Sequence, residues 1–219
     1  MFPFTQNPLE GAFSTAMHPT NFIKTLVNAK LAPYLFGALG WILMWELQGA
    51  LQRQIAALDY ATGVALIFLP AGIRTLAVLI FGFRGAAGVF LGCNLTTLLY
   101  FGDLPVLNLW LVLSISAISA FSAYVMMQLV CRWKKIGANL DELTFNDVLS
   151  IVITQGLLSA SLHQIIFAHL PLDGAYVDPS AMASFMLWAA MAAGDIVGSM
   201  LLMLSAIALS NLFHSLRHA

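Results

Sequence analysis

The stretch that decides the fold is FLPAGIR, residues 68–74, inside an apolar run at residues 61–82. About 20 apolar residues are enough to cross a bilayer as a helix. Pro70 lacks a backbone N–H and clashes with the preceding turn, which predicts a break in that helix, and Gly72 relaxes the backbone nearby. Arg74 then places a permanent charge near the membrane centre, at a cost of at least about 2.5–3.5 kcal/mol on insertion scales. A broken helix beside a buried guanidinium suggests a site. The structural alternative is a kinked helix whose Arg74 is neutralised by a carboxylate.

The composition is that of an integral membrane protein. Of the 219 residues, 60% are hydrophobic and 9% are charged, and the mean hydropathy is +0.88, whereas an ordinary soluble domain carries about 25% charged residues. No polar block is long enough for a separate catalytic or nucleotide-binding domain, so we expect any soluble activity from a partner protein. The net charge of −1 gives no sign of nucleic-acid binding. Cys93 and Cys131 fall in or at the end of apolar segments, which does not indicate a disulfide framework.

Six apolar segments predict an all-α fold, a polytopic membrane bundle of six transmembrane helices. They cover about residues 31–51, 61–82, 85–101, 105–131, 148–170 and 181–212. The division that follows is an N-terminal cytoplasmic lead-in (1–30), one transmembrane domain (31–213) and a cytoplasmic C-terminal tail (214–219). The lead-in lacks the basic start and compact apolar stretch of a cleaved signal peptide.

The charges of the loops predict the orientation, because Lys and Arg collect in cytoplasmic loops. With both termini cytoplasmic, seven basic residues fall inside: Lys24, Lys30, Arg84, Arg132, Lys134, Lys135 and Arg217. Arg53 falls outside. The outer loops carry Asp59, Asp103, Asp173 and Asp178. We therefore expect a multi-pass protein of a bacterial cytoplasmic (inner) membrane with six spans and both termini in the cytoplasm.

The main polar cytoplasmic piece is RWKKIGANLDELTFNDV, residues 132–148. One interpretation is a docking loop, with Lys134 and Lys135 against anionic lipid and Asp141, Glu142 and Asp147 facing a partner protein. The other interpretation is a solvated connector between two spans.

The polar residues expected at membrane depth are few. They are Glu46, Arg74, Asn94, Gln155, Ser159, His163 and Asp195. Ionisable groups at such depths normally face the bundle interior and pair with one another. One arginine here faces two carboxylates, which predicts that one carboxyl stays protonated or that a proton, a cation or a cationic ligand completes the cluster. Our hypothesis is that Arg74 pairs permanently with one acid and that the other, Asp195, exchanges a proton or accepts a ligand.

Gln155, Ser159 and His163 recur every four residues, which places them on one helical face. That face could line a polar cavity that opens outward. The alternative for His163 is a hydrogen-bonding strut between helices. No second metal-ligating side chain lies at a suitable spacing, so we predict no metal and no cofactor.

Small residues predict close helix packing in two places. The first pair is Gly88 and Gly92, and the second set is Ala190, Gly194 and Gly198. Asp195 lies inside the second set, where packing alone does not require an acid. The space left by the two glycines beside it is the reason for choosing Asp195 as the exchangeable acid.

None of the standard catalytic signatures occurs in the sequence. The sequence has no nucleophile elbow, no phosphate-cradling loop and no paired His and Glu on a helix with zinc spacing. We therefore predict a protein that is not an enzyme, with an intramembrane enzyme as the weaker alternative.

The residues LPAGIRTLAVLIFGFRGAAGVFLG, 69–92, resemble the bacterial membrane-associated sensor domains of the first (MASE-type) class, which are related to the membrane part of the hexose-phosphate sensor kinase. The stretch GDIVGSMLLML from Gly194 is similar to a later span of that family. By this resemblance Pro70, Gly72, Arg74 and Asp195 occupy motif positions. Family members are usually longer and fused to a kinase or cyclic-dinucleotide domain. The sequence shows neither, which departs from the family pattern and puts a direct signalling output in doubt.

Two functions follow as expectations. The first is a membrane sensor or binding protein with a buried polar site, which passes a signal to a partner through its cytoplasmic loops. The second is transport, since a six-span chain of this size resembles the substrate-binding subunit of an energy-coupling-factor vitamin transporter or a small ion- or proton-coupled carrier. Both expect a small-molecule ligand, a proton or a cation in a buried site, and only transport predicts solute accumulation in proteoliposomes.

Overall fold

A computed structural model describes residues 30–61, 64–102, 108–137, 140, 142–168 and 181–218. The contacts divide the chain into two units, Met1–Ala32 and Pro33–Ala219. Nearly all the described residues belong to the second unit. The predicted loop residues Lys24, Asp103, Asp141, Asp173 and Asp178 lie outside the described residues.

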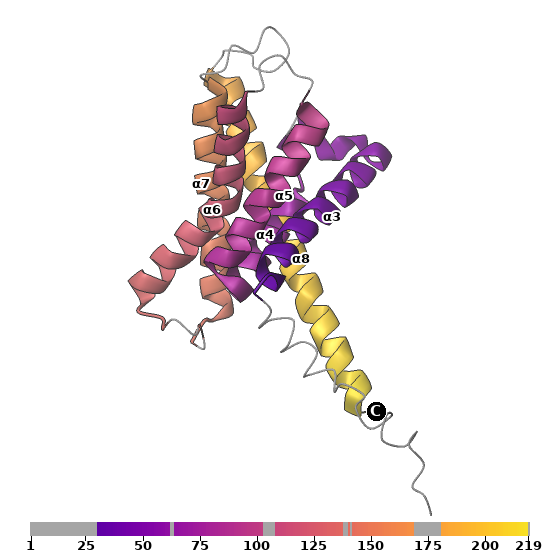
Figure 1. Cartoon of the computed structure of the whole chain (residues 1–219), viewed down its shortest axis with the longest axis vertical. Coiled ribbons are helices and arrows are strands. Elements are labelled where there is room, and N and C mark those ends of the chain that lie inside the picture. The colour runs from indigo at the N-terminus through magenta and orange to yellow at the C-terminus, as the bar shows by residue number, and fades with distance from the viewer. Residues whose placement is uncertain are drawn as a thin grey trace, which may run out of the picture. The chain divides into compact units, whose positions relative to one another are not determined.

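The described residues form an all-α structure, as predicted (Figure 1). Its helices are α3 (Ala32–Gln54), α4 (Leu69–Phe81), α5 (Phe83–Phe101), α6 (Leu109–Lys134), α7 (Phe145–Ala168) and α8 (Ala181–His218). Between α3 and α4 the chain makes a 3₁₀ turn, η1 (Ala56–Leu58), and a small antiparallel hairpin of β1 (Asp59–Ala61) and β2 (Val64–Ala65).

Three helices are long and apolar enough to cross a membrane. They are Leu109–Lys134, Phe145–Phe167 and Ala183–Phe213, which correspond to α6 and to most of α7 and α8. The helix Leu69–Phe81 is apolar but shorter. The described part of the chain therefore has the character of a membrane protein.

The prediction of one interrupted helix over residues 61–82 is wrong in its first half. Ala61 and Val64–Ala65 belong to the small hairpin, residues 66–68 are not helical, and the helix begins at Leu69 with Pro70 in its first turn. The first N–H groups of a helix have no intrahelical partner, so a proline there loses nothing and its fixed φ suits the helix. Pro70 therefore starts a helix and does not break one. Gly72 lies inside the regular part of α4.

Gly82 separates α4 from α5. Its φ is +58°, in the left-handed region that favours glycine. Its N–H donates to the carbonyl of Val78, which closes the last turn of α4 before the chain turns into α5. The third apolar segment therefore begins immediately after this residue, at Phe83.

Glycines bring α3 and α5 into close contact. A Cβ atom built at Gly88 would lie 2.4 Å from the backbone oxygen of Tyr34, and one at Gly92 would lie 2.6 Å from the oxygen of Ala38. Such distances leave no room for a side chain. Beside this contact, the buried Trp41 of α3 donates through Nε1 to Thr96 Oγ1 of α5 at 3.0 Å.

The glycines of α8 receive the extended segment before α4. Cβ atoms at Gly194 and Gly198 would each lie 2.0 Å from a backbone oxygen, of Ala65 and Phe68 respectively. Further along, a Cβ at Gly72 would lie 2.5 Å from Cβ of Leu202. The close approach of α4 to α8 therefore explains this glycine better than backbone relaxation does. The predicted packing residue Ala190 is also buried in α8.

The non-helical backbone before α4 finds partners within the protein. The N–H of Phe68 donates to the carbonyl of Gly194 at 3.0 Å, and the N–H of Leu69 donates to Oε1 of Gln48 at 3.1 Å. Irregular backbone at membrane depth is tolerated where the protein satisfies its polar groups. Gln48 of α3 and Gly194 of α8 thus hold the entry to α4 in place.

Candidate buried polar site

Arg74 lies in the second turn of α4 with 1% of its side chain exposed. Its Nη2 forms an ion pair with Oδ2 of Asp195 on α8 at 2.8 Å. Its Nη1 donates to the backbone carbonyl of Ser119 on α6 at 3.1 Å and to Oγ of Ser159 on α7 at 3.3 Å. One guanidinium therefore connects four helices that are far apart in the sequence.

The predicted polar face of α7 supplies the rest of the site. Gln155, Ser159 and His163 are all buried. Nε2 of Gln155 donates to the hydroxyl oxygens of Thr75 on α4 and Ser199 on α8. Ser159 accepts a hydrogen bond from Arg74, as described above, and His163 contacts Ser119 of α6. Each residue of this face therefore has a partner on another helix.

His163 joins α7 to α6. Its Nδ1 lies 2.8 Å from the backbone carbonyl of Ser159. A carbonyl can accept but not donate, so this contact assigns the proton to Nδ1. Nε2 is then the acceptor for the Ser119 hydroxyl, at 3.3 Å. The contacts are those of a strut between two helices.

Two side-chain atoms of Arg74 and of the α7 face have no hydrogen-bond partner among the described residues. They are Nε of Arg74, a donor, and Oε1 of Gln155, an acceptor. Both side chains are fully buried. Leaving a buried polar atom unmatched costs free energy, so these atoms favour a water molecule or a polar ligand atom beside them.

The prediction that Glu46 belongs to the buried cluster is wrong. Its side chain is exposed and accepts a hydrogen bond from the hydroxyl of Tyr100. The cluster therefore has one arginine and one carboxylate, and its charge is balanced without an added proton, cation or cationic ligand. Asp195 is itself the acid that pairs with Arg74, so the predicted division between a permanent partner and an exchangeable Asp195 does not hold.

Three other predicted site residues lie apart from the ion pair. Asn94 is half-buried and donates from Nδ2 to the carbonyl of Phe90 in its own helix, at 2.7 Å. Pro70 and Gly72 are buried in the first turns of α4, where they shape the helix start and its contact with α8. They position Arg74 but do not contact its guanidinium through any described hydrogen bond.

Four residues that complete the site and its support were not predicted from the sequence. They are Gln48, Thr75, Ser119 and Ser199, all buried. Helical spacing gives a signal for two of them. Gln48 follows the buried Trp41 by seven residues, and Ser199 follows Asp195 by four, so each pair shares one helical face.

The arrangement can bind a polar or charged group through its ion pair and hydroxyl groups. No group of three His, Cys, Asp or Glu side chains that could hold a metal ion occurs among the described residues. What the site offers is a desolvated ion pair, hydroxyl groups from four further positions and two unmatched polar atoms. No family model, curated protein or solved structure matches the chain.

Proposed function

We propose that this chain is a six-span protein of a bacterial cytoplasmic membrane that binds a small molecule at the Arg74 site. It has no enzymatic activity of its own. It passes the conformational change that follows binding to a partner protein through its cytoplasmic loops. The observation that carries the proposal is the buried guanidinium of Arg74, which ties four helices together while its Nε stays without a described partner.

The remaining three spans are supported by α3, α4 and α5. Helix α3 has 23 residues, about 34 Å at 1.5 Å per residue, and a bilayer core is about 30 Å thick. Exposed leucines follow one face of it at every fourth position: Leu35, Leu39, Leu43 and Leu47. Such a face suits lipid contact. Helix α4 has 13 residues, about 20 Å, so the extended segment before it would cover the remaining depth.

The ion pair supports a switching role. An anionic group that enters beside Arg74 would compete with the Asp195 carboxylate, and a proton on Asp195 would weaken the same contact. Either event loosens α8 from α4. A ligand changes a conformation only by its different affinity for the two states, and the exchange of one anion for another at Arg74 supplies such a difference.

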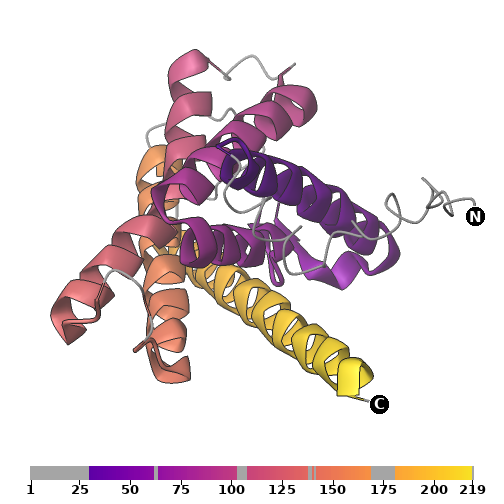
Figure 2. The same cartoon turned by 60° about the horizontal axis from the view of Figure 1, so that its bottom comes forward.

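Helix α8 is the element that would carry the change outward. It runs from Ala181 to His218, and its C-terminal half extends away from the other helices in Figures 1 and 2. Leu204, Leu209 and Phe213 are among its exposed apolar side chains. A movement at Asp195 would therefore be transmitted along one continuous helix toward the C-terminal end, which the loop charges predict to lie in the cytoplasm.

Transport is the second candidate, and the extended backbone before α4 favours it. Many transporters place their binding sites beside non-helical backbone at membrane depth, and Phe68 lies in non-helical backbone that is held against Gly194. Accumulation of a solute in proteoliposomes, with or without an added energy-coupling partner, would favour transport over sensing.

The proposal is tested by ligand-dependent stabilisation of the full chain in lipid nanodiscs. A set of amino acids, sugar phosphates, vitamins and nucleotides is screened for compounds that raise the melting temperature. We expect at least one compound to stabilise the natural protein and to have no effect on a variant with both Arg74→Leu and Asp195→Leu. Equal stabilisation of the two proteins would contradict a ligand site at Arg74.

A further inference from the structure

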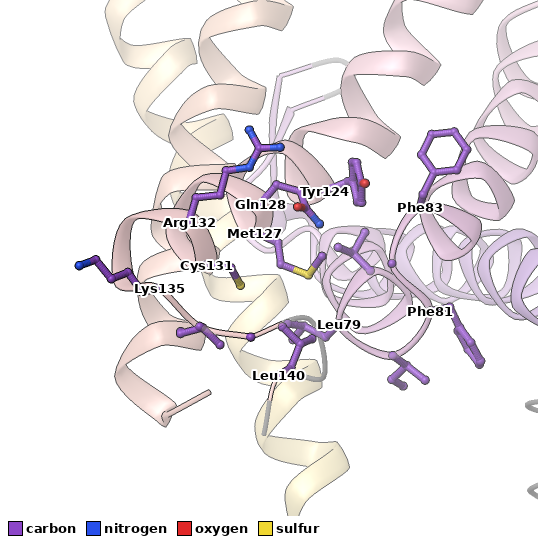
Figure 3. Close-up of a pocket in the computed structure, with 15 residues that line it drawn as sticks. Leu79, Phe81, Phe83, Tyr124, Met127, Gln128, Cys131, Arg132, Lys135 and Leu140 are labelled. Carbon is purple, nitrogen blue, oxygen red and sulfur yellow. The ribbon is translucent and has the colours of Figure 1, made fainter. Parts of the chain in front are cut away.

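A cavity lies at the opposite end of α4 from its N-terminal extended segment, away from the Arg74 site. It has a volume of about 710 Å³ and lies between the α4–α5 turn, the C-terminal part of α6 and the loop that follows α6 (Figure 3). None of its lining residues belongs to the Arg74 network.

The floor of this cavity is mainly apolar, although the polar side chain of Gln128 also lines it beside Met127. Leu79 and Met127 lie in its middle, and the ring of Phe83 lies on the side of α5 (Figure 3). More than half of the Phe83 side chain is exposed. A floor of this kind offers few polar contacts to a small water-soluble anion, but it suits the apolar surface of a hydrocarbon chain.

The rim of the cavity is basic. Arg132 and Lys135 line it from the end of α6, and Figure 3 shows their charged ends turned outward from the apolar middle. Among the described residues that line the cavity there is no Asp or Glu. Neither cation forms an ion pair with a described residue, whereas the neighbouring Lys134 is paired with Asp147.

The wall formed by the loop is held by its own contacts. Lys135 ends α6 with a φ of +60°, and the next N–H, of Ile136, returns to the carbonyl of Cys131 at 2.9 Å. At the far end of the loop, Asp147 accepts from the N–H of Thr144 at 2.9 Å and from its hydroxyl at 2.6 Å, in addition to its pair with Lys134. These contacts hold the two ends of the loop.

We propose that this cavity binds an acidic phospholipid, with an acyl chain on the apolar floor and the phosphate beside Arg132 and Lys135. The inference rests on the proposed topology, which puts the end of α6 at the cytoplasmic surface. Acidic lipids there attract basic residues next to membrane helices, and basic pockets between helices bind their headgroups. Combining an apolar floor with a basic rim favours a lipid over free phosphate.

Native mass spectrometry of the full chain in detergent tests this site. Phosphatidylglycerol, phosphatidylcholine and inorganic phosphate are titrated separately. We expect phosphatidylglycerol to bind more tightly than phosphatidylcholine by about thirtyfold, the order for two basic residues near an acidic headgroup. Inorganic phosphate should not displace it. Displacement by phosphate at a similar concentration would contradict a lipid as the occupant.

The variant Arg132→Gln with Lys135→Gln should lose this preference and bind both lipids alike. The charge-preserving variant Arg132→Lys with Lys135→Arg should retain it, and Arg53→Gln, an exposed arginine on α3, should have no effect. Circular dichroism and the melting temperature check that each variant is folded. An unchanged preference in the double glutamine variant would overturn the proposal. Binding in detergent does not depend on sidedness or on a ligand at Arg74, so its failure is distinguishable from failure of the proposed function.

Discussion

Arg74 and Asp195, separated by 121 positions in the sequence, form an ion pair of 2.8 Å in the interior of the helix bundle. No more than 5% of either side chain is exposed. A buried pair of this kind contributes little over a well-packed apolar pair, but losing one partner leaves an uncompensated charge and costs much more. The two residues therefore depend on each other more than on any other neighbour.

Gly198→Ala should destabilise the protein strongly, because the new Cβ would lie 2.0 Å from the backbone oxygen of Phe68. Backbone cannot give way as a flexible side chain can, and overpacking costs about 1–3 kcal/mol and sometimes more. The free energy of unfolding in mixed micelles, measured by SDS titration, checks this. The matched control is Gly49→Ala, whose Cβ would lie 3.5 Å from the end of the Arg53 side chain. Similar losses for the two variants would contradict the close contact of α8 with the extended segment.

Gln48→Leu should lower the free energy of unfolding by about 1–3 kcal/mol, the usual cost of leaving a buried donor unmatched. The donor is the N–H of Leu69 at the first turn of α4. Gln54→Leu, at an exposed position of the same helix, serves as the control and should change stability little. Hydrogen exchange at Leu69 should also become faster in the Gln48 variant. If exchange there stays as slow as in the natural protein, Gln48 does not hold the entry to α4.

The proposed topology predicts which exposed positions react with a membrane-impermeant maleimide. In a background carrying Cys93→Ala and Cys131→Ala, we expect Asp59→Cys to be labelled in intact spheroplasts. Lys135→Cys should be labelled after the membrane is opened. Labelling of Lys135→Cys in intact spheroplasts would indicate the opposite orientation in the membrane. It would then remove the basis for a lipid site at the cytoplasmic surface.

Helix identity was predictable because long apolar segments dominate the chain, and five of the six segments correspond closely to α3, α5, α6, α7 and α8. The prediction of one helix over residues 61–82 was wrong for a local reason. Proline disfavours a helix interior but favours a first turn, and hydropathy does not distinguish the two. The extended backbone before Leu69 depends on acceptors from Gln48 and Gly194, which lie far away in the sequence.

Within the site, the α7 face was predictable from its four-residue spacing, and Arg74 and Asp195 from the cost of charge at membrane depth. Glu46 was misplaced because depth alone does not tell which face of a helix turns inward. Trp41 and Gln48 share a face of α3, and Glu46 points elsewhere. The backbone acceptor of Ser119 carries no signal in residue type, so its contact with Arg74 required the fold.

The most direct measurement is a double-mutant cycle on Arg74 and Asp195, with unfolding followed in mixed micelles. Arg74→Leu and Asp195→Leu should each destabilise the protein by about 3–5 kcal/mol, because each leaves one buried charge unpaired. The protein with both substitutions should recover most of that loss, since two leucines replace the pair by apolar packing. If the two losses simply add in the double variant, the residues are not coupled and Arg74 does not organise the site.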